Sequence, residues 1–549
     1  MSRSPLSLAL GALLCAALAP SAAAQCQIQK FAGTGVAPLD GFGWSLSRSG
    51  STLFVGAIGD DTTAAAGGAV YVFERVGATW TQVQKLTQPG SAVQANFGNS
   101  MSVVGDRALV GSHMDGTGRV FHYTRTGGVW NQVQELTAPG LGPMFHFGHH
   151  VMISPDGQWA AAGTMRDDHA GVESGAVNLF ALSGGSFVWV AKVVASDAAP
   201  LARFGRTVAI EGNTLLVGAH RHDAERGAVY AFTRNDNGTP ANPLDDTWSQ
   251  TQKLQASDGV AGDHFGLGLS MQADEVAIGA ETDVHNGISS GSVYLFRRLG
   301  GVWTQAQKIT PPDAAADDGY GASTLLRGDR LLVGAKFRDE GAPDTGAVYV
   351  LERISGFFLP ATKLVAEDAA DSWFQGDEVS LDLDGDVVLS TAWGVSTNSG
   401  AAYAFELPRL YCTGKLNTAG CVPVVSYFGG HASTTNTAPW LVTAALVINN
   451  KVGLFFYSTN GEASIPFQGG TLCIGSPITR TNGQFSGGLP PPDDCTGKYS
   501  LDFNAYIQSG ANANLVPGAV VNGQYWYRDP NHPVNGSGLS NAIEFEICD

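Results

Sequence analysis

The chain has 549 residues, which is too long for one ordinary hydrophobic core and indicates several domains or one large repeat architecture. A hydrophobic content of 44% excludes a disordered chain, and 71 glycines with only 15% charged residues favour short strands joined by tight turns. The formal net charge of −18 argues against nucleic acid as a partner, because phosphates require a basic surface.

The first 24 residues have the pattern of a secretory signal peptide. Arg3 precedes an apolar run from Leu6 to Ala19, and small residues lead to an expected cleavage site near Ala24. A membrane anchor is the alternative, but this run is shorter than the roughly 20 residues that a spanning helix needs. We therefore expect a secreted or cell-surface protein with no transmembrane segment after cleavage.

A short motif repeats along most of the chain. A Phe-Gly pair first occurs at Phe42-Gly43 and returns about every 55 residues, up to a seventh, altered copy at Phe374-Gln375-Gly376. Each copy precedes an apolar segment that ends in small residues, such as Val55-Gly56-Ala57, and then a segment that begins with Gly, such as residues 68–73. A last segment, opened in several copies by Trp as at Trp80, completes the unit. The alternation of apolar and polar residues in these segments predicts half-buried strands.

Seven repeats of four short strands predict an all-β fold of the β-propeller type. A flat solenoid is the alternative, and the chain ends favour the ring. The seventh repeat lacks a fourth strand after Phe405, whereas residues 27–31 carry the Gln-x-Gln-Lys pattern of a fourth strand ahead of the first repeat. An N-terminal strand in that place would leave no open sheet edge. We therefore expect a seven-bladed β-propeller over residues 25–408, with the N-terminal strand closing the last blade.

The Phe-Gly, Gly-Ala and Gly-Ala-Val-Tyr motifs resemble the FG-GAP repeat of integrin α-subunit propellers, especially their shorter bacterial secreted relatives. The resemblance covers residues 27–407. It implies an extracellular propeller that takes part in protein binding or cell adhesion.

Many repeats of that family resemble calcium loops, and calcium requires several converging oxygen ligands. The corresponding connections here are short turns, and one of them has three alternating carboxylates, Asp382, Asp384 and Asp386. Too few ligands follow to complete a calcium loop. We therefore expect an acidic hairpin turn and no cofactor, with calcium as the alternative.

Strand order places two sets of loops on one face of the predicted propeller: those between the second and third strands, and those that lead to the next blade. Loops on a rigid scaffold commonly carry binding residues, and collected carboxylates would attract cationic partners or divalent ions. Each residue alone is typical of a solvated loop, whereas the face as a whole is the candidate binding surface. His220, His222 and Asp223 could bind a transition metal, although three local residues do not close a ligand set. The candidate binding residues are Asp60, Asp61, Asp115, Asp167, Asp168, His169, His220, His222, Asp223, Asp283, His285 and Asp339.

Residues 409–549 lack the repeat and form a second part of the chain. Apolar segments alternate there with Gly, Pro and Asn turns, and Asn449-Asn450-Lys451 suits a hairpin. We expect a small disulfide-containing β-sandwich-like domain that could bind carbohydrate, attach to a surface or serve in sorting.

Six cysteines remain after signal cleavage, an even number that indicates disulfides in an exported chain. Cys473–Cys495 is a plausible local bridge, and Cys26 could pair with Cys412, which would leave Cys421–Cys548. The sequence does not choose among the possible pairings. The expected disulfide cysteines are Cys26, Cys412, Cys421, Cys473, Cys495 and Cys548.

The leading functional hypothesis is a non-enzymatic secreted or surface protein whose propeller loops bind another protein or a glycan. One alternative is an extracellular hydrolase with its chemistry in the channel or in the C-terminal part. A hydrolase needs two carboxylates facing one bond, and the sequence does not show such a pair among Asp493, Asp494, Asp502, Glu544 and Glu546. A further alternative is a structural spacer with a C-terminal attachment or sorting module.

Overall fold

The computed structural model describes residues 26–548 apart from residues 78, 241, 341, 355, 369–374 and 376–380. The expected signal peptide lies outside the described residues, as do Phe374 and Gly376 of the seventh repeat. Across the described part of the chain, no helix has both the length and the apolar character that crossing a membrane requires.

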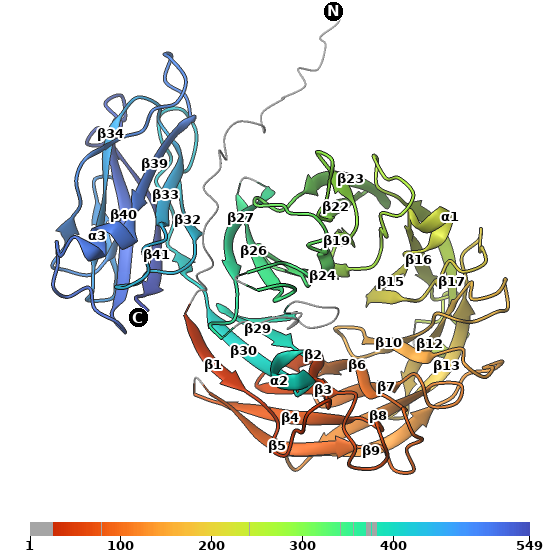
Figure 1. Ribbon diagram of the computed structural model, residues 1–549. Helices are drawn as coiled ribbons and strands as arrows, with labels where there is room; N and C mark the ends of the chain where they lie inside the picture. Colours follow the sequence, from red (N-terminus) through yellow and green to blue (C-terminus); the bar gives the residue numbers. More distant parts are fainter. Residues whose placement is uncertain are drawn as a thin grey trace, which may run out of the picture.

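Four-stranded antiparallel units follow one another along residues 27–406, and Figure 1 shows them set around a common centre. In each unit the strands are hydrogen-bonded in chain order, except that the last unit takes its outer strand from the N-terminus. The first three units are β2 (Phe42–Ser49), β3 (Thr52–Ala57), β4 (Ala69–Val76) and β5 (Thr79–Thr87); β6 (Phe97–Val104), β7 (Arg107–Ser112), β8 (Arg119–Thr126) and β9 (Val129–Leu136); and β10 (Phe147–Ile153), β11 (Trp159–Thr164), β12 (Ala176–Ser183) and β13 (Ser186–Val193). The next three are β14 (Thr207–Glu211), β15 (Thr214–Ala219), β16 (Ala228–Asn235) and β17 (Thr247–Leu254); β18 (Leu269–Gln272), β19 (Glu275–Ala280), β22 (Ser292–Leu299) and β23 (Val302–Ile309); and β24 (Tyr320–Arg327), β25 (Arg330–Ala335), β26 (Ala347–Ile354) and β27 (Phe357–Leu364). The last consists of β28 (Leu381–Asp384), β29 (Val387–Ala392), β30 (Ala401–Glu406) and β1 (Gln27–Phe31). Short elements occupy some of the loops: α1 (His222–Glu225), the 3-10 turn Pro243–Asp245, the β20 (Val284–His285) and β21 (Ile288–Ser289) hairpin, and α2 (Val395–Asn398).

The small residues of the repeat motif allow neighbouring sheets to approach closely. A Cβ atom on Gly56 of β3 would lie 2.2 Å from the carbonyl oxygen of Gly98, which belongs to β6 of the next sheet. Gly98 itself has a φ of +90°, a conformation that favours glycine. The Phe before it forms a parallel bridge with Gly68 at the start of the third strand. The Phe-Gly and Gly-Ala motifs therefore mark the contact between successive sheets.

Aromatic side chains fill the remaining space between sheets. Trp130 of β9 packs edge-on against Phe54 of the preceding sheet, with ring centroids 4.9 Å apart. Phe97 and Phe121 make a similar contact at 5.7 Å, and all four side chains are buried in one cluster. Edge-to-face pairs of this kind add to the free energy gained from burial. The repeated Trp and Phe residues are thus core residues.

A glutamine on the outer strand of several sheets bonds to the backbone of the next sheet. The side-chain amide of Gln84 donates to the carbonyl oxygen of Trp130, and the Trp130 N–H donates to Gln84 Oε1, at 2.8 and 2.9 Å. Gln29 of β1 makes the same two bonds to Trp80, at 3.0 and 2.8 Å. β1 also pairs antiparallel with β30. It therefore makes the contacts of a fourth strand toward sheets on both sides.

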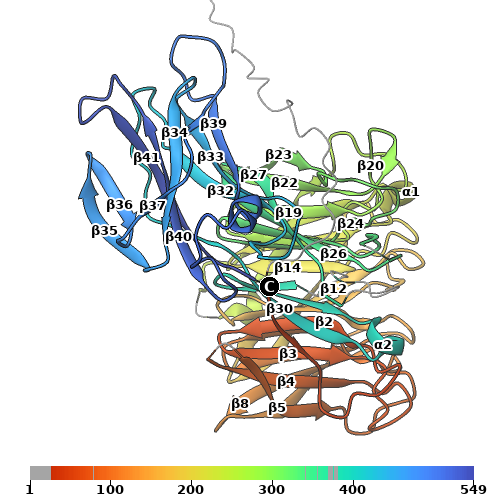
Figure 2. The ribbon, with the colours of Figure 1, turned by 60° about the vertical axis from the view of Figure 1, so that its left-hand side comes forward.

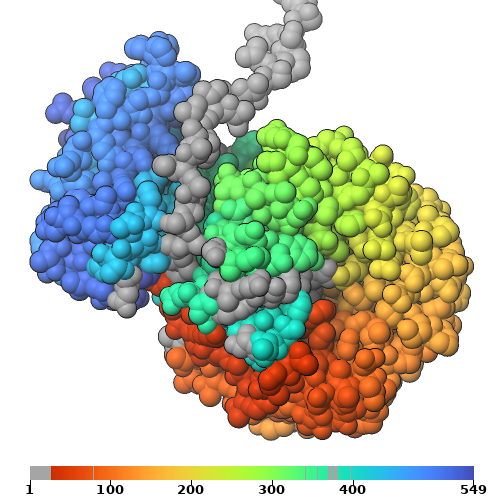
Figure 3. All heavy atoms as spheres, in the orientation of Figure 1, coloured from red at the N-terminus to blue at the C-terminus, as the bar shows by residue number. Residues whose placement is uncertain are grey.

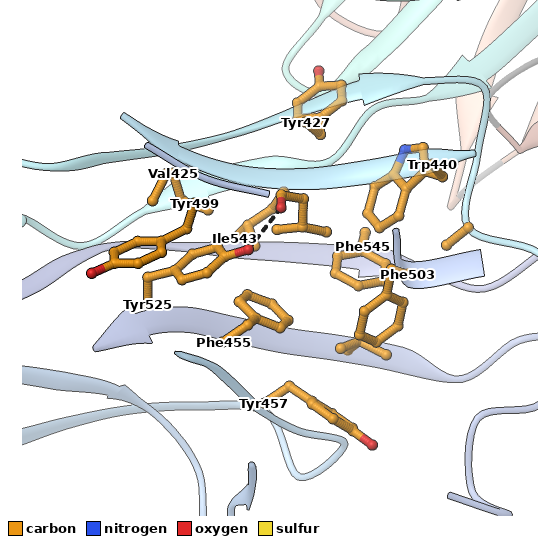
Figure 4. Close-up of a cluster of buried hydrophobic side chains, with 14 of the residues drawn as sticks. Val425, Tyr427, Trp440, Phe455, Tyr457, Tyr499, Phe503, Tyr525, Ile543 and Phe545 are labelled. Atoms are coloured by element: carbon orange, nitrogen blue, oxygen red, sulfur yellow. Dashed lines mark hydrogen bonds between the residues drawn. The ribbon is translucent and has the colours of Figure 1, made fainter. Parts of the chain in front are cut away.

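The C-terminal part consists of two facing sheets around an aromatic core (Figures 1 and 4). Trp440 and Phe545 pack there with ring centroids 4.4 Å apart, and the Tyr525 hydroxyl donates to the carbonyl oxygen of Val442 at 2.8 Å. One sheet contains β32 (Val424–Gly429), β33 (Trp440–Val447) and β39 (Gly497–Asp502), and the other contains β31 (Arg409–Tyr411), β41 (Ser537–Glu546), β40 (Val520–Arg528), β34 (Val452–Ser458), β37 (Thr479–Arg480) and β38 (Gln484–Phe485). The β35 (Glu462–Phe467) and β36 (Gly470–Ile474) hairpin and helix α3 (Phe503–Gln508) complete the domain.

All six expected cysteines form disulfides, but the pairs suggested by the sequence are wrong. The bonds are Cys26–Cys548, Cys412–Cys473 and Cys421–Cys495. The reason is the path of the last strand. β41 pairs with β31, which directly follows the repeat region, so the C-terminus returns to the point where β1 begins. Cys548 therefore lies beside Cys26, and Cys412 is left to pair with Cys473 on β36.

The two parts of the chain are in close contact (Figure 2), and Figure 3 shows the C-terminal part, in blue, at one side of the repeat region. β32 extends the sheet of β27 through a parallel bridge between Gly429 and Thr362, whose hydroxyl donates to the Gly429 carbonyl oxygen at 2.6 Å. Behind this bridge the Tyr427 hydroxyl donates to Glu352 at 3.2 Å, and Glu352 pairs with Arg330 at 2.8 Å. Together with Cys26–Cys548, these contacts attach the C-terminal domain to the repeat region at several points.

Candidate functional site

The two sets of loops lie at the same end of the repeat region, as the strand order predicts. The Gln94 N–H, in the loop after β5, donates to the Ala65 carbonyl oxygen in the loop between β3 and β4, at 2.8 Å. Equivalent bonds join Leu201 to Val172 and His264 to Glu225. We call this end, formed by the loops between second and third strands and the loops after fourth strands, the loop end. The opposite end, formed by the hairpins between first and second strands, is called the turn end.

Several of the predicted binding carboxylates are buried in a repeated ion pair with a tyrosine. Asp60 accepts a hydrogen bond from the Tyr71 hydroxyl at 2.8 Å and pairs with Lys85 at 2.7 Å, and its side chain is only 2% exposed. Burial raises the pKa of Asp60, but the hydrogen bonds from Lys85, Thr62 and Tyr71 outweigh it and hold that pKa below the usual value. The same contacts recur among Asp197, Tyr230 and Lys253; among Asp258, Asp283, Tyr294 and Lys308; and among Asp313, Tyr349 and Lys363. Of these carboxylates, Asp197 and Asp258 are about half exposed.

Asp167 is also a buried carboxylate in an ion pair, but its partners differ from those of Asp60. Its carboxylate is fully buried, pairs with Lys192 at 2.8 Å and contacts His169 Nδ1 at 2.7 Å. Asp60 and Asp283 therefore connect the third and fourth strands, Asp167 connects its own loop to the fourth strand, and none of the three is displayed to a partner.

A second group of predicted residues lies on the surface and shapes the loops. Asp61 accepts a hydrogen bond from the Ala66 N–H at 2.7 Å, Asp168 from the Glu173 N–H at 2.7 Å, and Asp339 from the Asp344 N–H at 2.9 Å. In each case one oxygen bonds the backbone five residues further on, and the side chain is exposed. These three carboxylates occupy equivalent positions in different sheets and are presented at the loop end.

The other predicted residues have individual partners. Asp115 pairs with Arg119 at 3.0 Å, Asp223 with Arg226 at 3.3 Å, and His285 contacts Asn286 at the tip of the β20–β21 hairpin. His222 is buried 3.5 Å from Asp197, whereas His220 packs against His264 with ring centroids 5.6 Å apart. No group of three or more His, Cys, Asp or Glu side chains that could hold a metal occurs among the residues that the structure describes. His220, His222 and Asp223 thus do not form a joint ligand set.

The three alternating carboxylates at β28 are bound by arginines from neighbouring sheets. Arg48 lies 3.5 Å from Asp382 and 3.2 Å from Asp384, and Arg330 lies 2.6 Å from Asp386. Arg75 contacts Asp384 at 2.5 Å as well. The carboxylates considered for calcium therefore balance arginine charges across the turn end.

The carboxylates considered for a hydrolase also have structural partners. Glu544 pairs with Arg409 at 2.9 Å, Asp493 pairs with Lys451 at 2.6 Å, and Asp502 caps α3 by accepting from the Ala505 N–H. Asp494 accepts from the Thr496 N–H at 2.9 Å. Glu546 lies with Glu544 beside a pocket of about 90 Å³ at the junction of the two parts.

Sequence reasoning missed a pocket at the centre of the loop end, which we call the central pocket. It has a volume of about 360 Å³ and takes one to four residues from each of several sheets, mainly at the start of first strands and just after second strands. No local motif marks such residues, because each repeat contributes only a few. Its lining residues are Trp44, Ile58, Asn96, Asn99, His113, His149, His150, Arg206, Thr207, Leu267, Gly268, Leu269, Ala322, Ser323, Thr324, Lys336 and Leu381.

Histidines are concentrated on one side of the central pocket. The ring centroid of His113 lies 5.1 Å from that of His146 and 5.0 Å from that of His149. Burial, followed by the nearby His146 and then by the charges of Arg206 and Arg166, lowers the pKa of His113 to about 3. Burial also lowers the pKa values of His146 and His150 to about 4. These imidazoles are therefore neutral at physiological pH.

Five segments of the chain match the FG-GAP repeat family: residues 26–73, 80–123, 187–232, 248–296 and 303–351. Each segment begins with a fourth strand and ends with the third strand of the next sheet, so the sequence repeat is offset by one strand from the sheets. The first match begins with β1, in the position that a fourth strand occupies in the other four. A comparison with curated proteins gives no match.

Proposed function

The chain is an FG-GAP repeat protein, and we propose that it is an extracellular, non-enzymatic binding protein that recognises a protein or a glycan through the loop end of its propeller. The repeat region is proposed to be a seven-bladed β-propeller closed by β1. Three disulfides fit an extracytoplasmic location, where oxidising conditions preserve them.

The observation that carries this proposal is the contrast between the buried and exposed carboxylates of the loop end. The inner ones, such as Asp60 and Asp167, pair with lysines and fix the strands. The outer ones, Asp61, Asp168 and Asp339, bond only a backbone N–H of their own loop in the described contacts and remain exposed. A rigid scaffold with exposed, well-ordered loop residues at one end is the usual arrangement of a recognition surface.

A non-enzymatic role is supported by Glu544, Asp493, Asp494 and Asp502, which are engaged in ion pairs, a turn and a helix cap. No cofactor is part of the proposal.

The C-terminal domain is proposed to brace the propeller, because it shares a sheet with β27 and a disulfide with Cys26. A spacer with a freely moving attachment module fits this junction less well.

The test is a binding screen of the mature protein against surface proteins and glycans, with and without calcium. Any saturable partner is then measured with the triple variant Asp61→Asn, Asp168→Asn and Asp339→Asn. Asparagine keeps the oxygen that accepts the loop N–H and removes only the charge. The matched control is Asp106→Asn, Asp274→Asn and Asp329→Asn, which removes three exposed carboxylates from the turn end.

We expect the loop-end triple to weaken binding about tenfold or more and the turn-end triple to leave it unchanged. Equal effects of the two triples would place the binding surface elsewhere. If saturable binding of a partner is abolished by a calcium chelator, recognition would be assigned to a bridging calcium ion.

A further inference from the structure

We propose that His264 makes part of the loop end sensitive to pH: its protonated ring holds α1 against the loop at residues 262–265, and loss of the proton releases α1. α1 lies between β15 and β16, and His264 lies in the loop between β17 and β18. This role concerns the conformation of the loop end and is independent of any macromolecular partner.

The backbone of α1 has a conformation that needs support from its surroundings. Asp223, Ala224 and Glu225 are consecutive residues with φ values of +55°, +55° and +66°. The left-handed region is unfavourable for residues that have a Cβ atom, and such residues normally enter it singly. Strained backbone persists only where the surrounding structure holds it. α1 is therefore an element that can change conformation when its contacts are lost.

The loop that contains His264 provides contacts of two kinds. Three backbone N–H groups within residues 262–265 donate to the carbonyl oxygens of residues 224–226, at 2.8 to 3.1 Å. The His264 side chain adds an ion pair, because its Nε2 lies 3.4 Å from a carboxylate oxygen of Glu225. On the other side of the ring, Nδ1 lies 3.7 Å from Glu281, directly after β19. The imidazole thus connects α1 to the end of a strand in the next sheet.

The oxygen atoms around the ring can only accept hydrogen bonds from it. The Thr282 hydroxyl lies 3.3 Å from Nδ1, but it donates to the Gly262 carbonyl oxygen at 2.5 Å, so its oxygen is left to accept. The ionised carboxylates of Glu225 and Glu281 are acceptors as well. Only the imidazolium has an N–H at both nitrogens. In the neutral ring, one nitrogen lone pair would face these oxygens, which removes the attraction on that side.

The neighbouring charges favour the protonated ring. Glu281, and after it Glu225, raises the pKa of His264 above the usual value of 6.5, against the effect of burial. The ring of His220, with its centroid 5.6 Å away, is neutral, because burial holds its pKa well below the usual value. A histidine with a raised pKa in the folded state stabilises that state fully below about pH 6.5, and this contribution is lost as the pH rises through the folded pKa.

The two carboxylates also have other cations beside them. Arg221 lies 3.5 Å from Glu225, and Lys336 lies 3.1 Å from Glu281. Arg221 belongs to the same loop as Glu225, and Lys336 comes from the sheet of β24–β27. Among the ion pairs of the described residues, His264 is the side chain that contacts both carboxylates. Its proton therefore affects the contact between the two loops more than either cation does.

The last sheet has the same backbone arrangement without the histidine. Thr397 and Asn398 of α2 also have left-handed φ values, +61° and +63°. The N–H groups of Leu39 and Gly41 donate to the carbonyl oxygens of these two residues at 3.1 and 2.8 Å. Gly41 occupies the position of His264 and has no side chain to titrate. α2 is therefore a control within the same molecule.

The experiment measures the protonation of His264 and the hydrogen exchange of α1 in the mature full-length chain. NMR titration of isotope-labelled histidine rings between about pH 6 and 9 gives the pKa, and His264→Gln identifies the resonance. Exchange of residues 221–227 and 395–400, corrected for the intrinsic pH dependence of amide exchange, is measured over the same range. Glu281→Gln is the second variant. The matched control is His532→Gln, which removes a ring that contacts the Val534 backbone; thermal melting verifies that each variant folds.

We expect the resonance of His264 to titrate above pH 6.5 and the protection of residues 221–227 to fall about tenfold or more through the same interval. His264→Gln should show the low protection at every pH, and Glu281→Gln should move both transitions to lower pH. His532→Gln should match the parent protein, and residues 395–400 should show no such transition. A pKa of His264 at or below 6.5 would overturn the proposal, as would protection of residues 221–227 that neither pH nor His264→Gln changes.

Discussion

Gln29 and Trp80 are joined by two hydrogen bonds, one in each direction, between the N-terminal strand and the outer strand of the first sheet. The same two bonds join Gln84 to Trp130 and Gln134 to Phe187, further along the chain. The N-terminal strand thus uses the device by which the internal sheets hold one another. This equivalence connects the stability of the whole repeat region to strand β1.

If the N-terminal strand is equivalent to an internal fourth strand, Gln29→Ala and Gln134→Ala should destabilise the protein by similar amounts. Each change leaves a backbone N–H and a backbone C=O of the next sheet without a partner, which costs about 1–3 kcal/mol. Denaturant unfolding monitored by tryptophan fluorescence measures the difference. Asn131→Ala, on an exposed side chain of β9, is the control and should change the free energy of unfolding by less than about 0.5 kcal/mol. A negligible effect of Gln29→Ala beside a large effect of Gln134→Ala would refute the equivalence.

The Cys26–Cys548 bond should contribute more to the attachment of β1 than the other two disulfides. The double variant Cys26→Ser, Cys548→Ser is expected to lose about 2–5 kcal/mol of stability and to become sensitive to proteolysis between β1 and β2. The double variant Cys412→Ser, Cys473→Ser should instead become sensitive to proteolysis within the C-terminal domain. Limited proteolysis with mass spectrometry locates the first cleavage. A non-reducing peptide map that linked Cys26 to Cys412 would contradict the observed path of the chain.

The buried pair of Arg330 and Glu352 should stabilise the junction of the two parts. The side chains are 11% and 7% exposed, so Glu352→Gln leaves a buried guanidinium with less compensating charge, although Arg330 also pairs with Asp386. Loss of one partner of a buried pair costs about 3–5 kcal/mol, and the second carboxylate should keep the cost near the lower value. Tyr427→Phe removes only the hydroxyl contact to Glu352 and should cost about 1 kcal/mol. Calorimetric unfolding measures both, and an order of effects opposite to this one would argue against a charge-dependent junction.

The neutral histidines in and beside the central pocket should make the protein less stable in mild acid. The pKa values of His113, His146 and His150 in the folded protein are about 3, 4 and 4, below the usual value of about 6.5 in the unfolded chain. The unfolded state therefore binds more protons as the pH falls through 6.5, and their stabilising contribution is lost progressively down to the folded pKa values. Each histidine contributes a slope of up to about 1.4 kcal/mol per pH unit in that window.

Urea unfolding between pH 7.5 and 4.5 measures this dependence. His146→Gln should flatten the curve between pH 6.5 and 4.5, since glutamine does not titrate there. Asn131→Ala, which removes an exposed side chain that carries no proton-binding group, is the control and should leave the slope unchanged. A curve for His146→Gln parallel to that of the parent protein would show that the histidine is not neutral in the folded state.

The periodic features of the fold could be read from the sequence. The Phe-Gly and Gly-Ala motifs predict the sheet contacts because each glycine has a neighbour's backbone against it, as Gly56 has Gly98. The Gln-x-Gln-Lys segment at residue 27 likewise indicates a fourth strand out of order, since Gln29 bonds to the next sheet as Gln84 and Gln134 do.

The features that depend on contacts between distant segments could not be predicted from the sequence. The disulfide pairs follow from the return of β41 to β31, which no local pattern encodes. Asp60 and Asp61 look alike in the sequence, but one is buried against Lys85 and the other exposed, because only Asp60 lies within reach of Tyr71. The central pocket collects residues such as His113, Arg206 and Lys336 from separate repeats.

Hydrogen–deuterium exchange of the mature protein, free and bound to a partner found in the screen, tests the proposed binding end most directly. The account predicts slower exchange on binding in the loops between second and third strands, such as residues 58–68, and in the loops after fourth strands, such as residues 88–96. The hairpins of the turn end and the strands of the C-terminal domain should exchange at unchanged rates. Protection confined to the turn end or to the C-terminal domain would contradict recognition through the loop end.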